Sequence, residues 1–191
     1  MTYTAVIAMR TITLVTGNAN KLRELQALAP PEMEFAAQSI DLPEIQSLDV
    51  REIVEDKVRR AYAAAQCPVI VEDVSTGLDA LHGLPGPFFK FFEKTLGKRA
   101  LLLLAPEPEP RVTIRCGAAY YDGVRMLYGE GVIRGHAVEP RGIHGFGFDF
   151  TVVPDGETRT MAEMTMEEKN TISHRAQAFR ALLAQLEHLA G

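Results

Sequence analysis

Two adjacent carboxylates, Glu72 and Asp73, directly follow the apolar residues 69–71. Such a run, bounded by polar and glycine residues, predicts a buried strand. We expect the carboxylates at its end, where a rigid support holds one of them toward a crevice. Lys90 follows in an aromatic run, after the glycine- and proline-rich loop 83–87. Carboxylates bind Mg²⁺ and ammonium groups pair with phosphate. This stretch is therefore typical of a metal-bridged phosphate site, and equally of a strand that ends in a solvated turn.

Cations stand at the predicted starts of two helices, where the helix dipole disfavours them. Lys21 falls in the first turn of a helix that Asn18 is expected to cap, and His174 and Arg175 follow the predicted cap Ser173. These positions are explained if the cations share exposed backbone N–H groups with a bound phosphate. The Gly-Asn-Lys turn does not have the Walker spacing, so taken alone it also fits a capped strand-to-helix turn.

Three further features have two interpretations each. Lys57 lies within or beside the apolar stripe of a predicted helix 49–66, so it either snorkels along the surface or reaches a cleft. Glu44 is a lone acidic loop residue, and solvent is the commoner environment for such a side chain. Residues 144–149 are rich in glycine and phenylalanine, which fits base stacking as well as a glycine bend beside a core aromatic cluster.

Strands and helices that alternate along the chain must position these residues. The Asp122-Gly123 dipeptide predicts a hairpin between the two longest strand-like runs. Thr165 and Glu168 form a capping-box pattern. We expect strands at 12–15, 33–40, 69–71, 111–121 and 124–135, and helices at 18–29, 49–66, 98–104, after Thr165 and after Ser173.

Composition limits the class of protein. The 191 residues are 47% hydrophobic and 24% charged, which is ordinary for one globular domain. The net charge of −5 disfavours a nucleic-acid partner. Cys67 and Cys116 lack metal-ligand spacing, so we expect both to be buried free thiols in a reducing compartment. The chain shows neither a membrane span nor a secretory pattern, so we expect a cytoplasmic protein in which residues 1–10 form a loosely ordered extension.

As a set and in this order, the motifs resemble one family, the inosine triphosphate pyrophosphatases, which hydrolyse non-standard purine nucleoside triphosphates. The resemblance spans nearly the whole chain from Thr16, and the set is far more specific than any single block. The matching blocks are TGNANK (16–21), IDLPE (40–44), VED (71–73), LPGPFFKFF (84–92), FGFD (146–149), AEM (162–164) and EKNTISHR (168–175).

The resemblance implies a role for each matching residue. Glu44 and Asp73 bind Mg²⁺, Asp73 also accepts the proton of the attacking water, and Glu72 is its supporting acid. The residues implied to hold the triphosphate are Thr16, Asn18, Lys21, Lys57 and Lys90. Phe146, Phe148 and Asp149 line the base pocket, while Lys169, His174 and Arg175 contact the 6-keto edge and the phosphates. The other implied substrate-binding residues are Gly17, Ala19, Asn20, Gly147 and Ser173.

The implied fold is α/β, a long, twisted mixed β-sheet flanked by helices. We expect residues 1–191 to form one domain of two lobes around a central nucleotide-binding cleft, usually assembled as a homodimer. The implied activity is that of a hydrolase acting on phosphoric anhydrides. It converts ITP, dITP and XTP, with Mg²⁺, to the monophosphate and pyrophosphate and so cleanses the nucleotide pool.

Three positions depart from the family pattern and concern substrate preference. Val74 stands where the family has serine or threonine, His82 replaces a glycine, and Phe150 replaces a proline. Two alternatives therefore stay open. One is a pyrophosphatase of the same fold with a shifted base preference, and the other is a nucleotide-binding regulator without catalysis.

Overall fold

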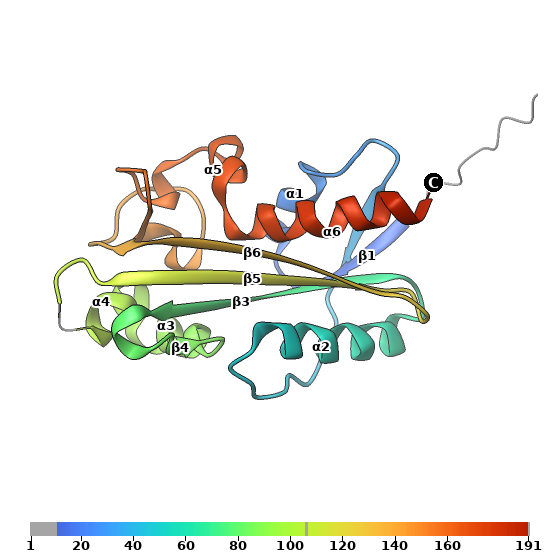
Figure 1. The fold of residues 1–191 in the computed structure, drawn as a ribbon, viewed down its shortest axis with the longest axis horizontal. Coiled ribbons are helices and arrows are strands. Elements are labelled where there is room, and N and C mark those ends of the chain that lie inside the picture. Colours follow the sequence, from blue (N-terminus) through green and yellow to red (C-terminus); the bar gives the residue numbers. More distant parts are fainter. Residues whose placement is uncertain (1–10, 106, 191) are drawn as a thin grey trace, which may run out of the picture.

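The computed structural model describes residues 11–105 and 107–190, in which a mixed, seven-stranded β-sheet carries helices on both sides (Figure 1). The main strand order is β2-β1-β3-β5-β6-β7, and β4 pairs with β3. The β1 pairings with β2 and β3 are parallel and the others antiparallel. The predicted mixed sheet flanked by helices is therefore confirmed. The strands are β1 (Thr11–Val15), β2 (Glu34–Gln38), β3 (Val69–Leu78), β4 (Pro85–Gly86), β5 (Arg111–Tyr121), β6 (Met126–Ala137) and β7 (Val152–Pro154).

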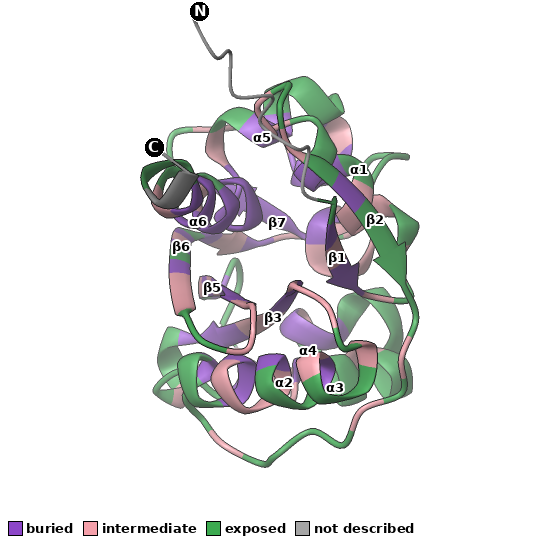
Figure 2. Ribbon diagram, turned by 90° about the vertical axis from the view of Figure 1, so that its right-hand side faces the viewer, coloured by how far each residue is buried: buried purple, intermediate pink, exposed green. Residues whose placement is uncertain are grey.

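Two groups of helices enclose the sheet (Figures 1 and 2). On one side lie α1 (Ala19–Gln26), α5 (Met166–Ile172) and α6 (His174–Ala190), and on the other α2 (Val50–Ala65), α3 (Phe89–Leu96) and α4 (Ala100–Leu104). The described residues also contain four single 3₁₀ turns: η1 (Asp79–Leu81), η2 (Gly97–Arg99), η3 (Gly147–Phe150) and η4 (Met161–Glu163). The predicted extension 1–10 lies outside the described residues.

Two expectations drawn from composition can be compared with the structure. Cys67 and Cys116 are both free thiols, as predicted, although only Cys116 is fully buried. None of the helices in the described part of the chain is long and apolar enough to cross a membrane.

The predicted capping residues begin the helices that they were expected to begin. The side chain of Asn18 accepts a hydrogen bond from the Asn20 N–H at 2.9 Å. Thr165 and Glu168 form the reciprocal capping box of α5. The Ser173 hydroxyl accepts a hydrogen bond from the Ala176 N–H at 3.2 Å, at the start of α6. Each cap satisfies backbone donors that a first helical turn leaves without partners.

Strand β3 is longer than its apolar run predicts. It covers ten residues, and its second half continues to pair with β5 as far as Leu78. The expectation that Glu72 and Asp73 end the strand is therefore wrong, because inter-strand pairing continues through the polar residues that follow the apolar run. Successive side chains of a strand point to opposite faces. Glu72 and Asp73 consequently enter two different environments.

The β5–β6 hairpin has a longer turn than predicted. Strand β6 begins at Met126 rather than at residue 124. The Asp122 carboxylate accepts hydrogen bonds from the N–H groups of Val124 at 2.9 Å and Arg125 at 2.7 Å. This side-chain bonding replaces ladder bonds, so both residues stay in the turn.

Within the described residues, three apolar clusters hold the helices against the sheet. The first joins α6 and α1 to β1, β3 and β5, the second joins α3 and α4 to the other end of β3 and β5, and the third joins α2 to β3. Their central residues are Leu25, Ile70, Phe179 and Leu182 in the first, Leu78, Phe89, Leu101 and Ile114 in the second, and Val54, Val58, Val69 and Val71 in the third.

Gly129 and Gly131 let α6 lie directly on β6. A Cβ atom added at Gly129 would collide with the Ala178 carbonyl oxygen, and one at Gly131 with the His174 carbonyl oxygen. A backbone obstacle cannot rotate away as a flexible side chain does. The start of α6 is thus seated against the sheet by backbone contact.

We expect Gly131→Ala to lower the free energy of unfolding by about 3 kcal/mol, because the new methyl group overpacks a backbone contact. Gly117→Ala on β5 is the matched control, since its Cβ would meet side chains rather than backbone, with the Tyr128 hydroxyl oxygen 3.1 Å away. The control should lose about 1 kcal/mol or less. Urea unfolding followed by circular dichroism measures the free energy of unfolding of both variants. Equal losses in the two variants would contradict the conclusion that backbone contact holds α6 against the sheet.

Candidate active site

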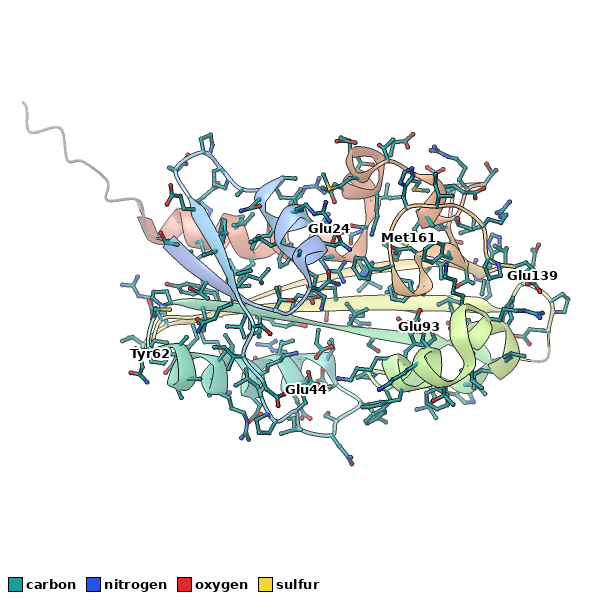
Figure 3. The ribbon with its side chains drawn as sticks, turned by 180° about the vertical axis from the view of Figure 1, so that it is seen from behind. Glu24, Glu44, Tyr62, Glu93, Glu139 and Met161 are labelled. Atoms are coloured by element: carbon teal, nitrogen blue, oxygen red, sulfur yellow. The ribbon has the colours of Figure 1, made fainter. Side chains whose placement is uncertain are left out.

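Two adjoining cavities bring the predicted phosphate and metal residues together. The larger, about 380 Å³, is lined by Thr16, Gly17, Asn18, Lys21, Glu44, Lys57 and Glu72 among others. The smaller, about 140 Å³, includes Glu44, Asp73 and Lys90 in its lining. Glu44, which is labelled in Figure 3, belongs to both linings, so it marks the place where the two cavities meet.

A cluster of two lysines and two carboxylates lies at this junction. Lys57 Nζ is 2.8 Å from Glu44 Oε1 and 3.2 Å from Asp73 Oδ2. Lys90 pairs with the other Glu44 oxygen, Oε2. Lys57 therefore reaches the cleft rather than snorkelling along the surface. Glu44 likewise contacts both lysines, although 31% of its side chain remains exposed.

The charges of this cluster stabilise one another. Burial raises the pKa of Glu44, but hydrogen bonds from Lys57 and Lys90 outweigh it and lower the pKa to about 2. Burial also lowers the pKa of Lys57, and the attraction of Asp73 and Glu44 reverses this effect and raises it overall. Glu44 and Lys57 are consequently ionised at neutral pH. Such an arrangement offers ammonium groups to phosphate and carboxylates to a cation.

Glu72 faces away from this cluster and anchors two cations on the other side of β3. Lys21 pairs with its Oε1, and Arg175 Nε lies 3.3 Å from its Oε2. Burial raises the pKa of Glu72, but the attraction of Lys21 and Arg175 outweighs burial and lowers it. Glu72 is 4% exposed. Its contacts thus position the first-turn cations of α1 and α6.

Glu24 is a site residue that the sequence analysis missed. It is 5% exposed and accepts hydrogen bonds from Arg175 Nη1 at 2.7 Å and Lys169 Nζ at 3.0 Å. Burial raises the pKa of Glu24, while the attraction of both cations lowers it overall. A sequence signal existed, since Glu24 stands three residues after Lys21 and four before Leu28, on one helix face.

Asp149 and Lys169 extend this chain of charges to the aromatic loop. Lys169 Nζ lies 2.8 Å from Asp149 Oδ2, which also accepts the Phe146 N–H at 3.0 Å. The ring centroid of Phe146 is 5.1 Å from Lys169 Nζ and 5.1 Å from the Arg175 guanidinium carbon. The loop is thereby held next to the cations, and the half-buried Phe146 ring is accessible to a planar ligand.

The rings of His174 and Phe148 pack against each other. Their ring centroids are 5.5 Å apart, and Phe148 also packs against Phe89 at 6.1 Å. Both nitrogens of the buried His174 ring lack hydrogen-bond partners among the described residues. Burial and the neighbouring Arg175 and Lys169 hold the pKa of His174 well below its usual value. The ring is therefore neutral and has one donor and one acceptor free for a ligand.

A third cavity, about 450 Å³, opens beside the loop and is lined by Asn20, Glu24, Phe146 and Lys169 among others. Gly147 adopts a φ of +63° within the loop, which favours glycine. Ser173 is buried and caps α6. The predicted site residues that line none of these three cavities are Ala19, Gly147, Phe148, Asp149, Ser173, His174 and Arg175.

We expect Glu24→Gln to destabilise the fold by about 3 kcal/mol at pH 7, because Lys169 and Arg175 lose a buried counter-charge. The folded-state pKa of Glu24 lies below its ordinary value of 4.5. Its contribution is therefore present above that pH and is lost as the pH falls through the folded-state pKa. Urea unfolding at several pH values measures this. The exposed Glu32→Gln is the control, and a pH-independent difference would contradict the assignment.

Comparison with known proteins places the chain among related sequences. The model of the Ham1 family matches residues 12–185. The inosine triphosphate pyrophosphatase of Pyricularia oryzae is 39% identical over 178 residues, covering 92% of this chain and 93% of the relative. Inosine triphosphate pyrophosphatase 1 of Trypanosoma cruzi is 44% identical over 177 residues, covering 91% of this chain and 90% of the relative.

Solved structures agree with this match. A HAM1 protein from Coxiella burnetii superposes with a TM-score of 0.80 at 29% identity, covering 94% of this chain and all of the other (100%). The Ham1 protein of Staphylococcus aureus, at 23% identity and a TM-score of 0.79, shares the fold and covers 94% of this chain and 100% of its own. By sequence and by fold, the chain belongs to the Ham1 family.

Proposed function

We propose that this chain hydrolyses ITP, dITP and XTP to the nucleoside monophosphate and pyrophosphate, with Mg²⁺ as cofactor. One observation carries the proposal: the Glu44–Lys57–Asp73–Lys90 cluster lies at the junction of two cavities. The names of the curated relatives, inosine triphosphate pyrophosphatases, support the same reaction.

The chemistry of the donor set fits Mg²⁺ brought together with a triphosphate. Glu44 and Asp73 offer hard carboxylate oxygens, and both contact Lys57. The described residues contain no group of three or more histidine, cysteine or acidic side chains suited to a metal. Mg²⁺ is typically held by one or two carboxylates together with substrate phosphates and water. When bound, it neutralises phosphate charge and lowers the pKa of coordinated water.

In this proposal the lysines hold the phosphates and Asp73 takes the proton. Asp73 Oδ1 accepts the Val74 N–H at 2.9 Å, while Oδ2 lies toward Lys57. Lys57 turns from the carboxylates to phosphate oxygens as the substrate binds. A water oxygen then forms a bond to the α-phosphorus as the bond to the bridging oxygen breaks. Asp73 Oδ2 receives the water proton, and pyrophosphate leaves. Glu72 supports this step by holding Lys21 and Arg175 in place.

Base selection follows from the groups at the other end of the site. Phe146 provides a face for the purine, and His174, Arg175 and Lys169 provide donors for a 6-keto oxygen. Adenine carries an amino group at this position, so it would leave a buried donor without a partner. Discrimination against guanine depends on its 2-amino group.

We further propose a cytoplasmic homodimer with no nucleic-acid partner. Large apolar side chains of α3 and α4 are exposed, with Phe91 at 57%, Leu96 at 40% and Leu103 at 59%. A second copy of the chain would cover these side chains. Sedimentation equilibrium reports the mass in solution, and a monomer at micromolar concentration would exclude the dimer.

We expect metal-dependent pyrophosphate release from ITP, dITP and XTP, about a hundredfold faster than from ATP, GTP or UTP. Asp73→Asn should lower the rate about a thousandfold, because the amide cannot accept the proton. Asp79→Asn is the matched control, since Asp79 is exposed and its carboxylate accepts a hydrogen bond from the Thr113 hydroxyl. Coupled phosphate detection, with Mg²⁺ and with a chelator, measures every rate.

Two results, from the same rate assay extended to dTTP and from a titration with ITP, would favour the alternatives. Turnover of UTP or dTTP equal to that of ITP would indicate a pyrophosphatase with a shifted base preference. Tight ITP binding without pyrophosphate release would indicate a regulator that has lost catalysis.

A further inference from the structure

Arg23 lines the third cavity, together with Phe146 and Lys169. It belongs to α1, and its neighbours Asn20 and Glu24 line the same cavity. Residues three and four positions apart share one face of a helix, so this face of α1 forms a wall of the cavity. Arg23 Nη2 donates a hydrogen bond to Asn20 Oδ1, which holds the guanidinium next to a second lining residue. None of the sequence blocks that marked the site includes Arg23.

Arg23 differs from the lysines of the site because it lacks a carboxylate partner. Each lysine that lines one of the three cavities pairs with at least one carboxylate. These lysines are Lys21, Lys57, Lys90 and Lys169. Within residues 11–105 and 107–190, Arg23 forms no ion pair, and its hydrogen bond to Asn20 uses only part of its set of N–H donors. The remaining donors and the positive charge are available to a ligand.

The other charges near this cavity offset one another. Lys169 lies between the carboxylates of Glu24 and Asp149. Glu24 also pairs with Arg175. The two carboxylates by themselves would repel an anionic ligand from this region, whereas Arg23 attracts one. The cavity can therefore accept a negative charge if that charge lies beside Arg23.

The proposed base contacts indicate which part of a nucleotide reaches Arg23. A purine that stacks on Phe146 and presents its 6-keto oxygen to Lys169 lies in this cavity. Positions 2 and 6 of a purine flank the same ring nitrogen, so a group at position 2 belongs to the same edge of the base. Xanthine carries an oxygen at position 2, whereas hypoxanthine carries only hydrogen there. Xanthine nucleosides also lose a ring proton near neutral pH, because the resulting charge is shared with the ring oxygens. Xanthine thus brings both an acceptor and a negative charge.

We propose that Arg23 pairs with the anionic xanthine base of XTP at its position-2 oxygen. This contact allows a site that recognises a neutral 6-keto purine to accept a negatively charged one as well. The inference rests on the proposed function, since it requires a purine nucleoside triphosphate in the site. It adds a residue that distinguishes the two bases, which the proposed contacts to the 6-keto oxygen do not.

The test compares kcat/KM for XTP with kcat/KM for ITP, measured by pyrophosphate release with Mg²⁺ in mildly alkaline buffer, where xanthine is ionised. We expect Arg23→Gln, which keeps a donor but removes the charge, to lower the ratio of XTP to ITP about fivefold, as for an exposed ion pair. The loss should arise mainly in KM for XTP. Arg23→Lys keeps the charge, so its ratio should stay within about twofold of the wild type.

The ratio separates a base contact from a general effect. Loss of a positive charge weakens the attraction of both triphosphates alike, and misfolding lowers both rates alike, so neither changes the ratio. Arg59→Gln on α2 is the charge-matched control, because Arg59 is exposed and bonds the Glu55 carbonyl oxygen of its own helix at 2.9 Å. It should keep the wild-type ratio.

Three results would overturn the inference alone. They are an unchanged ratio in Arg23→Gln, equal losses in Arg23→Gln and Arg23→Lys, and a wild type that hydrolyses ITP but not XTP. Absence of hydrolysis of both nucleotides by the wild type would overturn the proposed function as well.

Discussion

Buried charges of alternating sign connect the elements that build the candidate site. Glu72, Arg175, Glu24, Lys169 and Asp149 follow one another in contact, from β3 through α6, α1 and α5 to the aromatic loop. Burial by itself opposes ionisation of Glu72 and Glu24, and the adjacent cations reverse that effect. Each charge is tolerable only while its neighbours are in place. The site and the packing of these elements therefore depend on the same contacts.

The pleat of β3 divides this network from the lysine–carboxylate cluster. Neighbouring residues on one strand serve two faces, with Glu72 turned toward Lys21 and Arg175 and Asp73 toward Lys57. Because both residues belong to a strand that pairs with β5 at these positions, backbone geometry turns their side chains to opposite faces. The two proposed roles follow from this arrangement: Glu72 positions cations, and Asp73 is free to exchange partners.

Local chemistry explains which features were predictable from sequence. Asn18 and Thr165 cap helices through bonds to residues two or three positions away, so the sequence around them was sufficient. The length of β3 depends on pairing with β5, and the contacts of Glu24 join residues 151 and 145 positions apart. The local sequence around Glu24 therefore predicts these distant contacts only weakly. The motif resemblance supplied the site residues that periodicity alone could not distinguish from ordinary surface charges.

The small residues of β6 have a consequence for how accurately the cations are placed. Gly129 and Gly131 admit the backbone of α6 against the sheet, because its carbonyl groups fill the space that side chains would take. A slip of one helical turn would move the helix by about 5.4 Å, farther than any contact of Arg175 could stretch. The two glycines thus help to fix the position of α6 along the sheet. Substitutions farther along α6 can change how tightly the helix packs. The position of its first turn depends instead on the contact with these glycines of the sheet.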